Sequence, residues 1–303
     1  MFDILVAGEI NPDLILLGDV VPEFGQVEKL VDHAALAIGS SSAIFACGAA
    51  RLGLQVGFVG VCGTDIFGRF MLEEMQKRNV DVSHVIVRED GDTGLSVVLN
   101  QESDRAILTH PGLIAELTAS DIPDTLLRQA QHLHVASYFL QTNLQPGLPD
   151  LFWRARDLGL TTSLDTNYDP SEKWTGFDEL LSVTNVFLPN EKEALSLSGE
   201  SNVDEAASRL GSKLEALAIK LGEDGALGIR NGERVRVASI RVKVVDTVGA
   251  GDSFDAGFIY GYLKQWGLEK SLQLACTCGA LSTQAQGGTT SQPTFDEAMA
   301  FLK

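Results

Sequence analysis

The residues from Asp246 to Gly257 combine a glycine-rich turn with an acidic side chain. Gly249, Ala250 and Gly251 carry almost no side chain, so backbone N–H groups at a helix start can approach an anion closely there, and the helix dipole favours negative charge. Asp252 places a carboxylate in the same turn. Phosphoryl transfer needs a base for a hydroxyl group beside donors for the migrating phosphoryl group. The turn therefore indicates a kinase.

A purely structural role stays open on these residues alone. Gly-x-Gly turns also let a helix pack tightly on a strand, and an aspartate near a helix start can simply cap it. A dinucleotide-binding turn would need a third glycine and a P-loop would need Gly-Lys-Ser/Thr, and neither follows. The run Val242 to Val245 predicts a strand before the turn, and Ser253 to Leu263 predicts a buried helix after it.

The chain has 303 residues, 45% of them hydrophobic, which is enough to bury a large α/β core. Its first residues lack the basic and apolar regions of a signal peptide, and no apolar run is long enough to span a membrane. A formal charge of −18 disfavours binding to nucleic acid or to an anionic membrane. It does not exclude ATP, because Mg²⁺, backbone amides and a few local cations set the field at a phosphate site.

Four cysteines lie in apolar segments, as free core thiols do in a reducing cytoplasm: Cys47, Cys62, Cys276 and Cys278. His132 and His134 lie on one face of a predicted strand, with no third ligand at a suitable spacing. We therefore expect packing or hydrogen bonding for the histidines rather than a zinc site.

Polar residues follow predicted strands, at the edge where an open α/β sheet binds ligands. Asn11 and Asp13 follow the strand Asp3 to Ala7, and their donors and acceptors suit a vicinal diol, although an Asn-Pro turn is an alternative. The loop Gly39-Ser40-Ser41 opens a helix and can either donate to a polar ligand or cap that helix.

Two further segments, approximately 14–37 and 81–109, interrupt the α/β alternation with strand-like patterns and predict a small separate sheet. Arg105 lies in the second segment, where it can hold a substrate oxyanion or remain a solvated surface residue. Gln141 follows a strand end and is a further candidate for the ligand pocket. Glu193 suits Mg²⁺ held through water, although Asn190 to Glu193 is also a typical helix start.

The turn Asp246-Thr247-Val248-Gly249-Ala250-Gly251-Asp252 resembles the D-T-x-G-A-G-D signature of the PfkB, or ribokinase-like, carbohydrate kinases. Gly8 to Asp13 resembles their G-x-x-N-x-D motif, and Gly39 to Gly53 resembles their first signature, with Ser40 in place of Gly and Ile44 in place of Asn. The resemblance implies one domain over 1–303, with a three-layer α/β/α core and an inserted small β-sheet lid. It also implies a homodimer formed through that lid.

The resemblance makes Asp252 the catalytic base and Gly249, Ala250 and Gly251 the anion hole. It implies ATP and Mg²⁺ as co-substrate and cofactor. The residues expected at ATP are Asn190, Glu193, Lys220, Gly222, Gly225 and Cys276. Those expected at the sugar are Asn11, Asp13, Gly39, Ser40, Ser41, Arg105, Gln141 and Asn167. A monovalent cation such as K⁺ is expected at Asp246, Val248, Gly288 and Ser291.

Several relatives carry D-x-N-x-R where this chain has Asp165 to Asp169, so Asp169 replaces an arginine that would anchor an acidic or phosphorylated sugar. We therefore expect a cytoplasmic enzyme that moves the γ-phosphate of ATP to a small, uncharged sugar. A nucleoside kinase of the same fold is an alternative, because a nucleoside presents a ribose hydroxyl at the same place. A non-catalytic sugar or nucleotide sensor is another.

Overall fold

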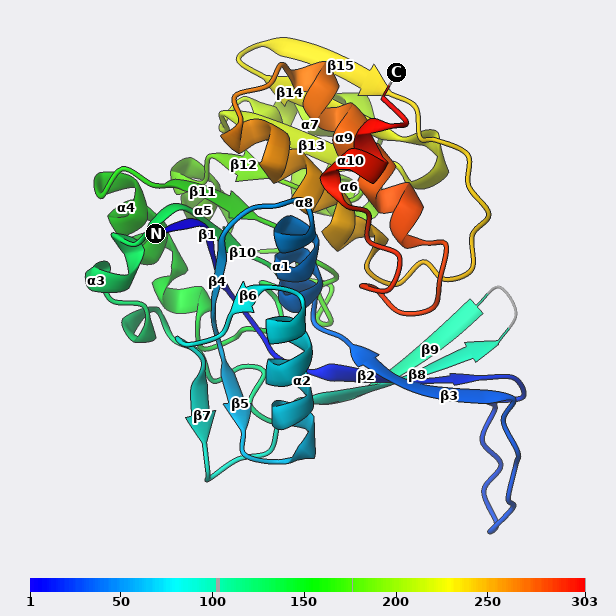
Figure 1. Ribbon diagram of the computed structural model, residues 1–303. Helices are drawn as coiled ribbons and strands as arrows, with labels where there is room; N and C mark the ends of the chain where they lie inside the picture. The colour runs from blue at the N-terminus through cyan, green and yellow to red at the C-terminus, as the bar shows by residue number, and fades with distance from the viewer. Residues whose placement is uncertain (102–103, 176, 303) are drawn as a thin grey trace.

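The computed structural model describes residues 1–101, 104–175 and 177–302, and its centre is a nine-stranded sheet (Figure 1). The strand order is β15-β14-β13-β12-β11-β10-β1-β4-β6. Neighbours from β6 to β13 pair in parallel, and β13, β14 and β15 pair antiparallel at one end. The strands are β1 (Phe2–Ala7), β4 (Val56–Val59), β6 (Val80–Asp81), β10 (Ala130–Val135), β11 (Thr161–Leu164), β12 (Val186–Phe187), β13 (Ala216–Lys220), β14 (Ala226–Arg230) and β15 (Glu233–Val237).

The central strand β1 shows why this sheet has helices on both faces. Ile4 and Val6 point into one hydrophobic core, whereas Leu5 and Ala7 point into a second one on the opposite face. All four side chains are fully buried. A parallel strand buried on both faces needs a continuous apolar run of this kind.

Helices from separate parts of the chain cover the two faces. One core contains residues of α1 (Ser41–Arg51), α2 (Ile66–Lys77), α8 (Ala250–Leu263), α9 (Leu268–Ser282) and α10 (Phe295–Met299). The other contains residues of α3 (Asp124–Leu127), α4 (Leu148–Asp157), α5 (Phe177–Val183), α6 (Glu191–Ser198) and α7 (Val203–Gly211). The molecule therefore has three layers, α/β/α, as expected.

A second sheet of four strands projects from this core (Figure 1). Its order is β3-β2-β8-β9, formed by β2 (Pro12–Leu17), β3 (His33–Ile38), β8 (Leu95–Gln101) and β9 (Asp104–His110). The contribution from the second predicted segment begins at Leu95 rather than near residue 81, because β6 joins the central sheet. In addition, β7 (Ile86–Arg88) pairs with β5 (Val61–Gly63).

The predicted strand at Val242 to Val245 is wrong, since these residues belong to no strand. Val244 and Val245 are 57% and 58% exposed, so their β-propensity has no neighbouring strand to pack on. The predicted helix after the turn is present as α8. The four cysteines are buried and free, and none of the helices in the described residues is both long and apolar enough to cross a bilayer.

Candidate active site

A cavity of about 430 Å³ lies where the carboxyl ends of the central strands face the second sheet. Asp13, Ser96, Val98, Arg105 and Ile107 line it from the second sheet. The central sheet and its helices contribute the remaining lining residues: Ser40, Ser41, Ile44, Asp165, Asn167, Asn190, Glu193, Lys220, Gly222, Thr247, Val248, Gly249, Gly251 and Asp252.

Most of the residues predicted from the sequence therefore meet at one place. Of those predicted residues, the cavity lining does not include Asn11, Gly39, Gln141, Gly225, Ala250, Asp246, Cys276, Gly288 and Ser291. Gln141 is 1% exposed, and its amide donates to the carbonyl of Ala136 at 2.6 Å. Cys276 is buried within α9.

The turn that starts α8 has a backbone conformation that requires glycine. Gly249 has φ of 73°, and a Cβ atom there would lie 2.7 Å from Cα of Gly288. The carbonyl of Gly249 accepts from the amide of Ser253 at 2.9 Å, so the helix begins directly after this turn. Free amides at a helix start favour an anion, and Gly249 and Gly251 line the cavity.

Asp252 lies in the first turn of α8 and is 7% exposed. Burial raises the pKa of this carboxyl to about 8, the charge of Asp165 adds to that rise, and Lys220 opposes it. A carboxyl with such a pKa accepts a proton more readily than an ordinary aspartate does. Its position and pKa suit a general base.

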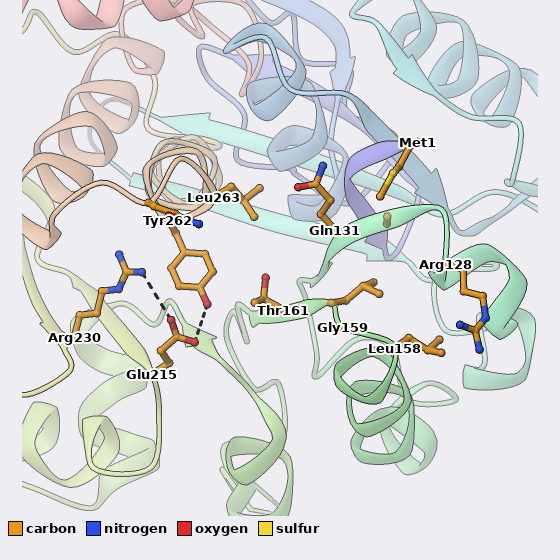
Figure 2. A pocket seen from close by; sticks show the side chains of 13 residues that line it. Met1, Arg128, Gln131, Leu158, Gly159, Thr161, Glu215, Arg230, Tyr262 and Leu263 are labelled. Carbon is orange, nitrogen blue, oxygen red and sulfur yellow. Dashed lines mark hydrogen bonds and ion pairs between the residues drawn. The ribbon is translucent and has the colours of Figure 1, made fainter.

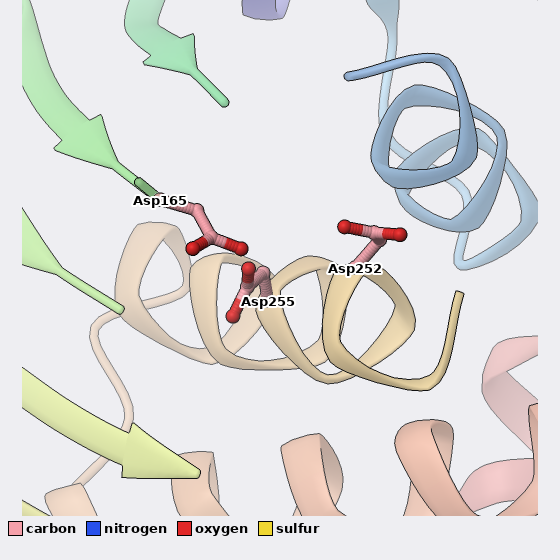
Figure 3. A group of neighbouring side chains, drawn as sticks. All are labelled: Asp165, Asp252 and Asp255. Carbon is pink, nitrogen blue, oxygen red and sulfur yellow. The ribbon is translucent and has the colours of Figure 1, made fainter. Parts of the chain in front are cut away.

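Two further carboxylates, Asp165 and Asp255, lie near Asp252 (Figure 3). Lys220 forms ion pairs with both of them. Its Nζ lies 2.9 Å from Asp165 Oδ2 and 3.1 Å from Asp255 Oδ2, and both aspartates are 1% exposed. Asp165, Asp252 and Asp255 each offer an oxygen within 4.8 Å of the others, a spacing that a metal ion could use. The ammonium group of Lys220 already supplies positive charge to this cluster. A Cβ atom on Gly251 would lie 3.6 Å from Nζ, so that charge also lies next to the glycine turn.

Asn190 and Glu193 form a capping box at the start of α6. Glu193 Oε2 accepts from the Asn190 amide at 2.9 Å, Oε1 accepts from Asn190 Nδ2 at 2.6 Å, and the Glu193 amide donates to Asn190 Oδ1 at 2.9 Å. Burial, with a contribution from Asp165, raises the pKa of Glu193 to about 7. The helix-start interpretation of this motif is therefore correct, and the same two residues also line the cavity.

At the opposite side of the cavity Asp13 is 8% exposed, and burial raises its pKa to about 7 while the nearby Arg105 lowers it. Asn11 Nδ2 donates to Asp13 Oδ1 and to Ser96 Oγ, both at 3.4 Å. A Cβ atom on Gly39 would lie 2.2 Å from Asp13 Oδ1, so Gly39 makes room for that carboxylate. Asn11 and Gly39 thus contact Asp13 without lining the cavity themselves.

Asp246 holds the loop that follows α9 against the glycine turn. Its Oδ1 accepts from the amide of Val248 at 3.0 Å and its Oδ2 accepts from the amide of Gly287 at 2.9 Å. The two segments predicted to share a monovalent cation are therefore joined through this carboxylate.

A larger hollow, of about 790 Å³, lies at the amino ends of β10 and β11 (Figure 2). There Glu215 accepts from the Tyr262 hydroxyl at 2.9 Å and lies 3.8 Å from Arg230. None of the predicted site residues lines it. Because the residues able to bind substrates or take part in catalysis line the smaller cavity, we assign the candidate site there.

The histidines are structural, as expected. His132 is hydrogen-bonded to Thr161 Oγ1 and Ser163 Oγ, both at 2.7 Å, and His134 to Ser163 Oγ at 2.7 Å. Both rings are fully buried, and burial lowers the pKa of each.

Sequence reasoning missed Asp255 and Glu9. Asp255 follows Asp252 by one helical turn, so its spacing already placed both carboxylates on one face of the predicted helix. Glu9 lies between Gly8 and Asn11 in a motif used for the prediction, and its carboxylate is hydrogen-bonded to Ser42 and Ser137. Only the fold shows these last contacts, because they span 33 and 128 residues.

Comparisons with known proteins agree with this geometry. The family model described as pfkB family carbohydrate kinase matches residues 1–295. An ATP-dependent ribose-1-phosphate kinase of Halopiger xanaduensis is 30% identical over 307 residues, covering 100% of this chain and 98% of that protein. A 2-dehydro-3-deoxygluconokinase of Bacillus subtilis is 31% identical over 297 residues, covering 92% of this chain and 90% of that protein.

Solved structures share the fold along the whole chain. A PfkB protein of Polaromonas sp. JS666 has a TM-score of 0.83 at 26% identity, covering 99% of this chain and 100% of that one. A ribokinase of Arabidopsis thaliana has a TM-score of 0.86 at 22% identity, covering 100% and 99%. With the family model matched over nearly every residue, this chain belongs to the pfkB family of carbohydrate kinases.

Proposed function

We propose that this kinase transfers the γ-phosphoryl group of ATP to a hydroxyl group of a small, uncharged sugar. The observation that carries the proposal is the position of Asp252: a buried carboxyl with pKa near 8 lies in the first turn of α8, beside the amides of the glycine turn. The hydroxyl oxygen forms a bond to the γ-phosphorus, its proton passes to Asp252, and the bond to the β-phosphate oxygen breaks to release ADP.

The backbone amides from Gly249 to Gly251 are the proposed donors for the migrating phosphoryl group. Lys220 adds a fixed positive charge next to them, since Asp165 and Asp255 hold its ammonium group in place. Charge that is already in position stabilises a transition state without reorganisation during the reaction. The sugar hydroxyl is proposed to meet Asp252 from the side of Asp13, Ser41 and Asn167.

The charges around the cavity support an uncharged sugar. The lining contains four acidic residues, Asp13, Asp165, Glu193 and Asp252, against two cationic ones, Arg105 and Lys220. Asp169 takes the place of the arginine that would anchor an acidic or phosphorylated sugar. Its carboxylate instead accepts from the amides of Ser171 and Trp174, both at 2.8 Å. Because burial raises the pKa of Asp13, Glu193 and Asp252 to about 7 or 8, these carboxyls are only partly ionised near neutral pH. An anionic sugar would still meet repulsion from their ionised fraction and from the phosphates of ATP, which a neutral polyol avoids.

The same excess of acid fits a divalent cation with ATP. Glu193, with Asn190, is the proposed holder of Mg²⁺ through water, and the ion would supply positive charge between the phosphates. An E. coli relative that shares this fold was solved with ATP and Mg²⁺. We also propose that Asp246, with carbonyl groups of Val248, Gly288 and Ser291, binds a monovalent cation such as K⁺.

The second sheet is the proposed lid and dimer interface. Its inner face contributes Asp13 and Ser96 to the cavity, so a closed position would exclude water from the reaction. Its outer face carries a row of paired apolar residues across all four strands, Leu36–Leu14–Val97–Leu108. Leu36 is 39% and Leu108 61% exposed, and a second copy of this sheet would cover them.

A coupled assay of ADP release tests the substrate class. The panel is D-ribose, D-fructose, ribose 5-phosphate, gluconate and adenosine, each with MgATP. We expect turnover with a neutral sugar. Faster turnover of ribose 5-phosphate or gluconate would contradict the uncharged-sugar proposal, adenosine turnover would favour a nucleoside kinase, and tight sugar binding without ADP release would favour a sensor.

A further inference from the structure

Glu9 is a buried carboxylate whose hydrogen-bond partners, among the residues that the structure describes, are all uncharged. It follows β1 and is 2% exposed. Its Oε1 accepts from Ser137 Oγ at 2.8 Å and from the amide of Ser42 at 3.3 Å, and its Oε2 accepts from Ser42 Oγ at 2.6 Å. Burying a carboxylate without a cation opposes folding unless hydrogen bonds replace its water. This unfavourable burial indicates that Glu9 serves to position other polar side chains.

From Glu9 a chain of hydrogen bonds leads to Asp252. Asn167 Nδ2 donates to Ser137 Oγ at 2.8 Å and to Ser41 Oγ at 2.5 Å. Ser41 and Asp252 line the same cavity, and the Ser41 hydroxyl lowers the pKa of the Asp252 carboxyl against the stronger effect of burial. The order of the chain is therefore Glu9, Ser137, Asn167, Ser41 and Asp252.

Glu9 gives this chain a direction. Ser137 Oγ donates its one proton to Glu9 Oε1, so the oxygen of Ser137 accepts from the amide of Asn167. The same amide nitrogen donates to the oxygen of Ser41. The hydroxyl proton of Ser41 is then directed to Asp252. Each hydroxyl group has only one proton. The acceptor at the Glu9 end of the chain therefore sets the direction of every hydrogen bond between Glu9 and Asp252.

The backbone around the chain is held in an uncommon conformation. Ser40, Ser137 and Asn167 have φ of 64°, 51° and 54°, in the left-handed region that residues other than glycine seldom adopt. Ser40 Oγ also donates to the carbonyl of Glu9 at 2.7 Å and accepts from the amide of Ala43 at 3.0 Å. Three such residues in one network indicate that the fold enforces these side-chain positions.

We propose that Glu9 is a positioning residue for Asp252, acting through Ser137, Asn167 and Ser41 to keep a hydroxyl donor on the carboxylate of the base. One oxygen of Asp252 is thereby held, and the carboxylate is presented to the sugar hydroxyl in one orientation. This inference rests on the proposed role of Asp252 as the base.

The two substitutions Glu9→Met and Glu9→Gln separate orientation from charge. Methionine has a similar size and no acceptor oxygen, so Ser137 loses its fixed partner. Glutamine keeps an acceptor at the Oε1 position, because the amide of Ser42 donates there and excludes an NH₂ group, while its own NH₂ can donate to Ser42 Oγ. The control is Ser42→Ala, which removes an equally buried hydroxyl partner of Glu9 that lies outside the chain.

The assay is initial-rate kinetics with MgATP and with D-ribose or D-fructose, whichever turns over faster, together with thermal unfolding. We expect kcat of Glu9→Met to fall by about tenfold to a hundredfold, as for a misplaced catalytic group, with KM for MgATP nearly unchanged. We expect Glu9→Gln and Ser42→Ala to stay within about threefold of the unchanged protein, the range in which side-chain geometry is preserved.

Full activity of Glu9→Met would overturn the proposal. An equal loss of activity in Glu9→Gln and Glu9→Met would also overturn it, because the charge of Glu9 and not the orientation of the hydroxyl groups would then matter. A loss in Ser42→Ala equal to that in Glu9→Met would point to a merely structural role. Crystal structures of Glu9→Met and Glu9→Gln give a readout that needs no sugar: only in Glu9→Met is Ser41 expected to turn from Asp252. If Asp252→Asn were active in the same assay, the proposed function itself would fail.

Discussion

The ammonium group of Lys220 lies 3.1 Å from a carboxylate oxygen of Asp255, one helical turn after Asp252 on α8. Asp165 lies on its other side at 2.9 Å. Burial raises the pKa of Asp255 well above its usual range. Burial acts the same way on Asp165, but there Lys220 prevails and the pKa falls. The two shifts therefore favour a proton on Asp255 and a negative charge on Asp165 that balances Lys220.

This difference predicts opposite outcomes for two matched substitutions. Asp255→Asn replaces a protonated carboxyl with an amide of the same shape, so kcat/KM should stay within about threefold of the unchanged protein. Asp165→Asn removes the partner of a buried cation, which should destabilise the fold by roughly 3 kcal/mol and lower kcat/KM. Denaturant unfolding and initial rates measure both, and equal losses in the two variants would show that the proton is not on Asp255.

The pKa of Asp252 predicts how activity depends on pH. Since the carboxylate form is the base, kcat/KM should rise with pH and level off above about pH 8. Below that pH the carboxyl is protonated and cannot accept the hydroxyl proton. Rates at saturating Mg²⁺, with unfolding followed at each pH, provide the measurement. A flat profile between pH 6 and pH 9, tested on a folded protein, is incompatible with Asp252 as the group that titrates.

The cation proposed at Asp246 predicts a dependence on the added salt. We expect kcat/KM to be several-fold higher in KCl than in choline chloride at equal ionic strength, because a bound cation would fix the glycine turn against the loop at Gly288. Asp246→Asn should abolish the difference between the salts, since a neutral amide binds a cation more weakly. Equal rates in both salts for the unchanged protein would contradict a monovalent cation site at Asp246.

The outer face of the second sheet predicts the oligomeric state. Leu108→Glu places a charge in the apolar row Leu36–Leu14–Val97–Leu108 and should convert a dimer to a monomer in sedimentation velocity. Trp153→Glu is the matched control, because Trp153 is 58% exposed on α4 and Leu108 is 61% exposed. A monomer before any substitution, or a dimer that survives Leu108→Glu, contradicts an interface on this face.

The sequence predicts the parts of the site that a contiguous motif contains. Gly249 to Asp252 form one turn, so their spacing alone places a base beside backbone amides. Lys220 was expected at the nucleotide, but its role beside Asp165 and Asp255 depends on two strands and a helix meeting, which no local pattern specifies. The position of Glu9 depends in the same way on Ser137, 128 residues away.

The fold could be predicted wherever apolar runs bury both faces of a strand, as in β1. The prediction failed at Val242 to Val245, where valines with high β-propensity lie in an exposed segment with no partner strand. It also extended the second sheet too far, because the alternation near residue 81 does not reveal which sheet a short strand joins.

The stability of Asp252→Asn provides a check that the variant is folded. Because the folded-state pKa of Asp252 is raised from 3.8 to about 8, its ionisation opposes folding progressively as pH rises through that window. Asparagine has no such titration. The variant should gain stability relative to the unchanged protein from about pH 4 to pH 8 and keep a constant advantage above it.

The turnover number of Asp252→Asn, measured with MgATP and the preferred neutral sugar, tests the account most directly. We predict a loss of kcat of about two orders of magnitude or more with ATP affinity retained, the scale expected when a general base is removed. Asp255→Asn, the same chemical change one helical turn away, should remain active. An Asp252→Asn variant that turns over at nearly the original rate would contradict the assignment of the base and the mechanism built on it.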